Sequence, residues 1–185
     1  MWRALFFVSA IVIVHSNVIQ DFLSKETYII AAMPSEEMKN VNLDCSNIKF
    51  TRNGHCSCSC EGKDTPLIEF AIHKYPTMPD AVPLIEVTNE DQLNSAKSIK
   101  CDCPHVNNIL ENTTLVLMKL EEDSYLTTFC DHRPMRPLGT QMCQERILSK
   151  AGLTQAKVDE MTSGVKGITS SWFANNNCSQ YNNPK

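Results

Sequence analysis

Short apolar stretches bounded by turn-forming residues dominate the first two thirds of the chain, and they predict β-strands rather than long helices. Residues 115–120 and 125–130 flank an acidic turn, which predicts a β-hairpin. A second hairpin is predicted around Asn53-Gly54, a dipeptide typical of tight turns, between residues 48–50 and the cysteines that follow. The remaining strand candidates are residues 66–72 and 83–87.

Helical signals lie mainly in the last third of the chain. Gln141 to Lys150 and Thr154 to Thr162 have the composition of two short helices separated by a glycine. A short helix is also predicted over Gln92 to Ser98, because Thr88 provides a capping hydroxyl three residues before a carboxylate. Asn17 to Lys39 fits helix or strand equally. This order of elements predicts an α+β fold: a small disulfide-rich secreted domain with β-hairpins in the first two thirds and short helices in the last third.

The N-terminus has the organisation of a secretory signal peptide. Arg3 provides the positive charge, Leu5 to Val14 is apolar, and cleavage is expected after Ser16. An apolar run of about ten residues is too short to cross a bilayer as a helix. The predicted organisation is a signal peptide over residues 1–16, one disulfide-stabilised domain over residues 17–174, and a polar Asn-rich tail over residues 175–185.

Nine cysteines follow the predicted signal, and in an exported protein they indicate a disulfide framework. Because nine is odd, one thiol either stays free or pairs with another chain, which would give a disulfide-linked dimer. Cys178 lies alone in the Asn-rich tail and is predicted to be this odd cysteine. The predicted framework consists of the other eight, Cys45, Cys56, Cys58, Cys60, Cys101, Cys103, Cys130 and Cys143.

The spacing of the cysteines indicates where bridges form. On a strand, residues two apart point to the same face, so Cys56, Cys58 and Cys60 would form one row and Cys101 and Cys103 another. Sulfurs within a row point in parallel, so at least one bridge is predicted between the two rows. A zinc site with nearby histidines is the alternative, but Cys-x-Cys spacing suits one ion poorly. Those histidines are His55, His105 and His132.

Charge and motifs exclude several functions. Without the signal, 16 basic residues face 21 acidic ones, a formal charge of −5, which disfavours nucleic acid or an anionic membrane as partner. A catalytic cysteine with His132 as its base has no recognised local signature, and Gly-x-Ser-x-Gly is absent from the sequence. The acidic runs are most simply solvated loop charges. We therefore expect no catalytic residue, no metal ligand, no cofactor and no membrane insertion.

Two features are candidates for contact with other molecules. Arg133 and Arg136 lie in a proline-restricted segment, where they would form a rigid cationic edge that binds carboxylates of a target. The alternative is that this segment is a rigid connector whose arginines are solvated. Asn112 and Asn177 each begin an Asn-x-Ser/Thr glycosylation motif, and the second motif contains Cys178.

Four features together support a resemblance to a known protein family. They are the signal peptide, the chain length, the lack of an enzyme motif, and the two cysteine segments Cys56-Ser57-Cys58-Ser59-Cys60 and Cys101-Asp102-Cys103-Pro104. The chain resembles the larger cysteine-rich venom proteins of centipedes, scoloptoxin family eleven. That resemblance implies a venom-gland product that acts outside cells, on ion channels or on haemostasis. The resemblance does not assign a functional role to any individual residue of this chain.

The sequence therefore predicts a secreted, non-enzymatic binding protein, most concretely a venom toxin that modulates an ion channel. The first alternative is an extracellular protease inhibitor or haemostasis-interfering protein, in which Arg133 to Arg136 would enter a protease cleft. The second is a small secreted hydrolase or carrier, which would need a concave apolar site with converging polar groups. The expected partner is an extracellular ion channel, receptor or protease.

Overall fold

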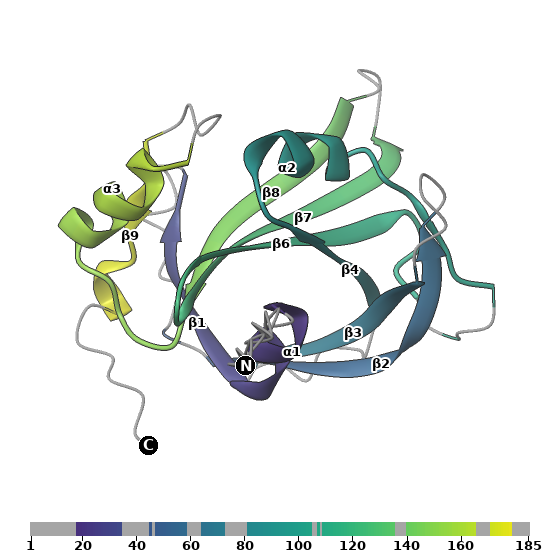
Figure 1. Cartoon of the computed structure of the whole chain (residues 1–185), viewed down its shortest axis with the longest axis horizontal. Coiled ribbons are helices and arrows are strands. Elements are labelled where there is room, and N and C mark those ends of the chain that lie inside the picture. Colours follow the sequence, from purple (N-terminus) through teal and green to yellow (C-terminus); the bar gives the residue numbers. More distant parts are fainter. Residues whose placement is uncertain are drawn as a thin grey trace, which may run out of the picture.

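A closed β-barrel of seven strands forms the centre of the molecule (Figure 1). The computed structural model describes residues 18–34, 45, 47–58, 64–72, 81–104, 107, 109–135, 140–165 and 171–178. Around the barrel the strand order is β1-β2-β3-β4-β6-β7-β8, and β8 pairs again with β1. Because the sheet closes on itself, the backbone N–H and C=O groups of its first and last strands can pair with each other.

The elements that surround the barrel are short. Strand β5 pairs with the second half of β2, and β9 pairs with the end of β1. The strands are β1 (Thr27–Met33), β2 (Ile48–Cys58), β3 (Asp64–Ile72), β4 (Val82–Val87), β5 (Cys101–Asp102), β6 (Thr113–Glu121), β7 (Ser124–Met135), β8 (Thr140–Ser149) and β9 (Phe173–Ala174). The helices are α1 (Val18–Ser24), α2 (Glu90–Ala96), α3 (Gln155–Ser163) and the 3₁₀ turn η2 (Asn176–Cys178).

One neighbouring pair of barrel strands is parallel. Strands β4 and β6 run in the same direction, with Leu84 opposite Leu115, whereas the other neighbours in the barrel are antiparallel. A parallel pair needs a crossover connection, and here α2 and β5 lie in the connection between the two strands. Helix α2 begins after Asn89, whose side chain accepts a hydrogen bond from the Gln92 backbone. It is therefore Asn89, and not Thr88, that caps this helix.

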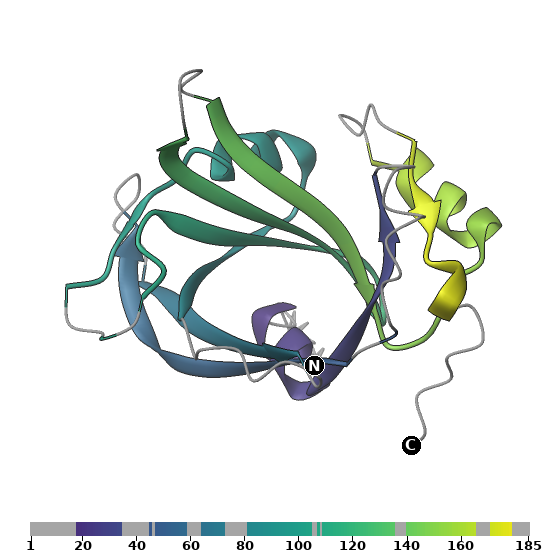
Figure 2. The same cartoon turned by 180° about the vertical axis from the view of Figure 1, so that it is seen from behind.

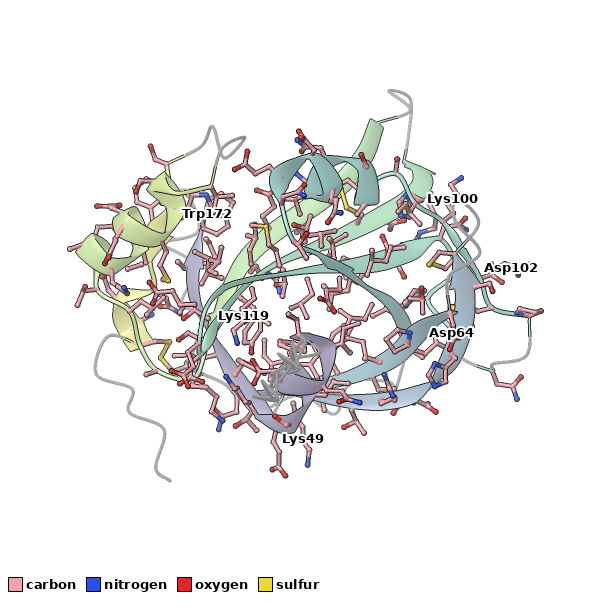
Figure 3. All side chains as sticks on the ribbon, in the orientation of Figure 1. Lys49, Asp64, Lys100, Asp102, Lys119 and Trp172 are labelled. Atoms are coloured by element: carbon pink, nitrogen blue, oxygen red, sulfur yellow. A yellow bond between two sulfur atoms is a disulfide. The ribbon has the colours of Figure 1, made fainter. Side chains whose placement is uncertain are left out.

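Both faces of the barrel sheet are partly buried. Side chains such as Leu117 and Tyr125 pack inside the barrel, whereas their neighbours Val116 and Leu126 pack against the outer elements. Helix α2 covers the outer face of β4 and β6, and α3 with β9 lies beside β1 (Figures 1 and 2). Trp172, 3% exposed, fills the space between α3 and the barrel (Figure 3). This burial on both faces hides the alternation typical of a half-exposed strand.

Helix α1 closes one end of the barrel. Phe22, which is fully buried, stacks on Tyr28 with ring centroids 4.7 Å apart and lies 4.9 Å from Phe50 and 5.1 Å from Tyr125. Such aromatic clusters add to the apolar burial of each ring. The segment that was ambiguous in sequence is thus a helix followed by a barrel strand.

The structure confirms much of the predicted order but corrects the fold class. The strands at residues 66–72 and 83–87, the hairpin of β6 and β7, and helix α3 form as predicted. However, Gln141 to Lys150 is not a helix, because it lies within and just after β8, which pairs with β7 and β1. The chain is therefore mainly a β-barrel with short helices rather than an α+β arrangement of separate hairpins.

The predicted hairpin at Asn53-Gly54 is also wrong. Strand β2 continues through this dipeptide to Cys58, and its pairing with β3 shifts register between Arg52 and His55. Gly54 has a φ of 91°, a conformation that glycine adopts without steric cost. The dipeptide thus forms a β-bulge, in which a positive φ bends the strand instead of reversing it.

The predicted boundary of a loose tail at Asn175 does not hold for residues 175–178. Asn175 is buried, and its backbone and side-chain amides donate to the carbonyls of Ala31 and Ile30. Cys178 is fully buried and forms a disulfide with Cys45. Residues 179–185 and the predicted signal, residues 1–16, lie outside the described residues.

Candidate functional site

A pocket of about 240 Å³ lies inside the barrel, on strands β2, β3, β6, β7 and β8. Six of its nine lining side chains are apolar, and three of these are phenylalanines. The other three carry hydrogen-bonding groups. The lining residues are Ile48, Phe50, Phe70, Leu115, Thr127, Phe129, Gln144, Arg146 and Leu148.

The strand register brings these residues together. Phe50 lies opposite Phe70 on β2 and β3, and Phe129 lies between Leu115 of β6 and Gln144 of β8. Because side chains alternate along a strand, residues two apart on each strand share the inner face. Residues from positions far apart in sequence therefore line one concave surface.

The pocket is closed on one side and open on the other. Phe50 and Leu148, which line it, also belong to the buried cluster around Phe22 of α1. Phe70 and Phe129 are only partly buried, and Gln144 is exposed. The mouth of the pocket is thus at the Phe129 and Gln144 end, and the aromatic cluster at α1 forms its floor.

The polar groups of the pocket converge on β7 and β8. Nη2 of Arg146 donates to Oε1 of Gln144 at 3.1 Å, and Oγ1 of Thr127 donates to the Arg146 carbonyl at 3.2 Å. Burial lowers the pKa of the Arg146 guanidinium from its ordinary value, although an arginine remains charged. The arrangement provides a cationic hydrogen-bond donor within an apolar cavity.

A polar network holds α1 on the end of the barrel. Asp21 accepts hydrogen bonds from Lys119 Nζ at 2.6 Å and from the Tyr125 hydroxyl at 2.8 Å. Donation from Lys119 lowers the pKa of the Asp21 carboxyl, and burial raises the pKa of Tyr125 to about 12. Lys25 pairs with Asp123 at 2.8 Å. These contacts fix the floor of the pocket, because they join α1 to the β6–β7 hairpin.

A second hollow, of about 260 Å³, lies between α2 and strands β3 and β4. Its lining includes the carboxylates of Asp64 and Glu86. The Asp64 side chain is 75% exposed and lies 3.3 Å from Nδ1 of His55, and Glu86 is half-buried. These charges remain in contact with water, and no aromatic side chain lines this hollow, whereas three phenylalanines line the barrel pocket around Arg146.

The predicted cysteine framework forms four disulfides among the described residues. Cys56 binds Cys103 and Cys58 binds Cys101, which is the connection between rows that the alternating spacing predicts. Cys130 and Cys143 lie directly opposite each other on β7 and β8 and are joined. The fourth bridge, Cys45–Cys178, corrects the prediction that Cys178 is the odd cysteine or links two chains. Cys60 lies outside the described residues.

The structure describes one of the two arginines of the predicted cationic edge, Arg133. Arg133 lies in strand β7 rather than in a polyproline connector, and its guanidinium pairs with Asp131 at 2.5 Å. Hydrogen bonds from Arg133 lower the pKa of the Asp131 carboxyl to about 2. Arg136 lies outside the described residues. Target binding by Arg133 stays a prediction, with an internal carboxylate as the competing partner.

The glycosylation motifs lie at the surface. Asn112 is exposed at the turn before β6 and has a φ of 62°, which asparagine tolerates. Asn177 is exposed in the 3₁₀ turn next to the buried Cys178. Use of either site stays a prediction.

The eight cysteines that the structure describes are all in disulfides, so none of these eight offers a thiol to a neighbouring histidine. Cys130 is in a disulfide, so it provides no nucleophile for His132. Nε2 of His132 lies 2.9 Å from Oγ1 of Thr114, and burial lowers the pKa of its imidazole. Within the described part of the chain, no group of three or more His, Cys, Asp or Glu side chains is placed to hold a metal ion. His105 lies outside that part.

Comparisons with protein-family models, curated proteins and solved structures find no match. The assignment of the pocket as a candidate functional site is therefore based on the geometry of this structure. Sequence reasoning missed the pocket because a helix was predicted where β8, which supplies three of the lining residues, forms. The strand candidate at residues 66–72 indicated one wall, but no local pattern reports that a sheet closes on itself.

Proposed function

We propose that this protein is a secreted carrier that holds a small, mainly apolar molecule inside its barrel. The observation that supports the proposal is the pocket itself, with three phenylalanines and a half-buried guanidinium on the inner face of one closed sheet. Ligand sites are typically concave, largely apolar and equipped with a few placed polar groups. Of the functions that the sequence left open, a small secreted hydrolase or carrier needs such a site, and the mainly apolar lining favours holding a ligand.

Export of the carrier is supported by its disulfides. Four bridges among the described residues suit an oxidising compartment. No described helix combines the length and apolar character required to pass through a bilayer. The ion-channel toxin and the protease inhibitor stay proposals with less specific support, because Arg133 is paired with Asp131.

A neutral dye tests whether the barrel binds apolar molecules. N-phenyl-1-naphthylamine fluoresces strongly in apolar surroundings, and we expect saturable binding of one dye per chain. Leu115→Trp should weaken binding about tenfold or more, because the indole occupies the pocket. Leu120→Trp is the matched control, since Leu120 is on the same strand but packs against the outer cluster. Unchanged binding by folded Leu115→Trp would contradict the proposal.

A further inference from the structure

Arg146 has an unusual environment for a charged side chain. Its neighbours in the pocket are mainly apolar, and the three phenylalanines among them are Phe50, Phe70 and Phe129. The recorded side-chain partner of its guanidinium is the neutral amide of Gln144. Arginine has five N–H donors, so most of its hydrogen-bonding capacity is directed elsewhere.

Acidic side chains near Arg146 in sequence and space point away from it. Glu145, the preceding residue on β8, pairs at 2.7 Å with Lys97, which directly follows α2 on the outer side of the barrel. Glu69, next to Phe70 on β3, accepts a hydrogen bond from Asn53. Among the described residues no carboxylate forms an ion pair with Arg146. Arg146 is half-buried, and a charge that is partly removed from water gains free energy when a counter-charge pairs with it.

We infer that the natural ligand is a small organic acid whose carboxylate binds Arg146, with its apolar part among the phenylalanines. This inference rests on the proposed carrier function. The planar guanidinium matches a carboxylate through two parallel N–H···O bonds. The Gln144 side chain lies beside that position and adds a hydrogen-bonding group at the mouth. Binding gives Arg146 a counter-charge that no described residue provides.

The volume of the pocket limits the size of the acid. A cavity of about 240 Å³ corresponds to about eight water volumes of about 30 Å³ each. This volume suits an aromatic or medium-chain acid, and the end of a longer chain or of a larger molecule such as the dye would extend through the open mouth. Decanoic acid is a suitable probe, and 1-decanol is its neutral counterpart of equal chain length.

The test measures how well decanoate and 1-decanol displace N-phenyl-1-naphthylamine at neutral pH. For the wild-type protein we expect decanoate to bind about 10- to 100-fold more tightly, as the loss of a charge-assisted hydrogen bond implies. Arg146→Gln should abolish this preference by weakening decanoate binding while 1-decanol binding is kept. Arg146→Lys should retain part of the preference, because it keeps the charge but loses the bidentate geometry.

Lys49→Gln is the matched control for lost charge. Lys49 lies on β2 between Ile48 and Phe50, which line the pocket, but its own side chain is exposed on the outer face (Figure 3). This variant loses the same unit of positive charge, and we expect it to bind both probes as the wild type does. Equal loss of decanoate binding in Lys49→Gln and Arg146→Gln would overturn the inference, since the preference would then depend on net charge alone.

The outcomes separate the two proposals. If the wild-type protein binds dye and 1-decanol, but decanoate no more tightly, the acid inference fails and the carrier stands. If it binds neither dye, alcohol nor acid, both fail. The comparison within the wild type needs no variant, so the inference stays testable even if Arg146→Gln does not fold.

Discussion

At the scale of single residues, the surroundings of each charge decide its role. Arg146 is enclosed by apolar side chains, and the described residues place no carboxylate against it. Asp131 is also largely buried, but Arg133 Nε donates to both of its carboxylate oxygens at 3.0 Å. The first charge is available to a ligand, whereas the second is used within the fold. Sequence alone would rank the exposed arginine as the better binding residue.

The Asp131–Arg133 pair predicts a pH dependence of stability. The folded-state pKa of Asp131 is about 2, below its ordinary value of 3.8, so the pair stabilises the fold above that ordinary value. This contribution is lost as the pH falls from about 4 to about 2. Asp131→Asn should therefore lower the urea midpoint at neutral pH, and its difference from the wild type should vanish near pH 2.

Asp102→Asn is the control for this measurement, because Asp102 is exposed on the short strand β5. We expect its urea midpoint to follow that of the wild type at each pH. A constant offset between Asp131→Asn and the wild type over the whole range would show that the pair does not act through ionisation.

At the scale of elements, helix α1 both closes one end of the barrel and contributes to the floor of the pocket. Its seven residues would not form a stable helix in isolation. Phe22 anchors the helix inside the barrel, and Asp21 joins it to Lys119 and Tyr125. The same aromatic cluster forms the floor of the pocket. Tertiary packing therefore stabilises the helix, and the helix closes the barrel.

Phe22→Ala should lower the free energy of unfolding by about 3–5 kcal/mol, because it removes a fully buried ring from a cluster that cannot collapse around the gap. Leu23→Ala should cost less, because Leu23 is only partly buried on the same helix. Urea unfolding followed by circular dichroism measures both. Equal losses would mean that α1 contributes through its helical conformation and not through the buried ring.

At the scale of the whole molecule, the disulfides differ in how far apart in sequence the segments are that they connect. Cys45–Cys178 joins the approach to β2 to the C-terminal 3₁₀ turn, across a sequence separation of 133 residues. Cys130–Cys143 joins two strands that are already hydrogen-bonded, across 13 residues. In the chain-entropy model, a bridge that closes a longer loop restricts the unfolded chain more strongly.

Replacing both cysteines of a bridge by serine should therefore cost more for Cys45–Cys178 than for Cys130–Cys143. From the loop lengths we expect losses of about 5 and about 3 kcal/mol in the free energy of unfolding. Urea unfolding of the oxidised proteins measures both, after mass spectrometry has confirmed the remaining bridges. The opposite order would show that native packing around Cys130 and Cys143 outweighs the entropy of the unfolded chain.

Predictions from local sequence patterns were correct where a single turn, helix cap or row of alternating residues determines the structure. The β6–β7 hairpin follows from its acidic turn, and α3 follows from its cap at Thr154. The bridges between Cys56, Cys58, Cys101 and Cys103 follow from their alternation. Local patterns failed at β8, because Gln144 and Arg146 line the pocket while Glu145 pairs with Lys97 outside, so polar side chains on both faces remove the alternation that distinguishes a strand. They failed at Asn53-Gly54, because a bulge and a turn use the same backbone conformation.

The sequence by itself determined the disulfide chemistry, most strand positions and the connection between the two cysteine rows. These depend on residue type and on spacing along a single segment. Only the tertiary structure decided that seven strands close into a barrel, that Cys178 pairs with Cys45, and that Arg146 faces a pocket lined by phenylalanines. Closure and burial depend on contacts between residues about 100 positions apart, and no local pattern in a single chain records them.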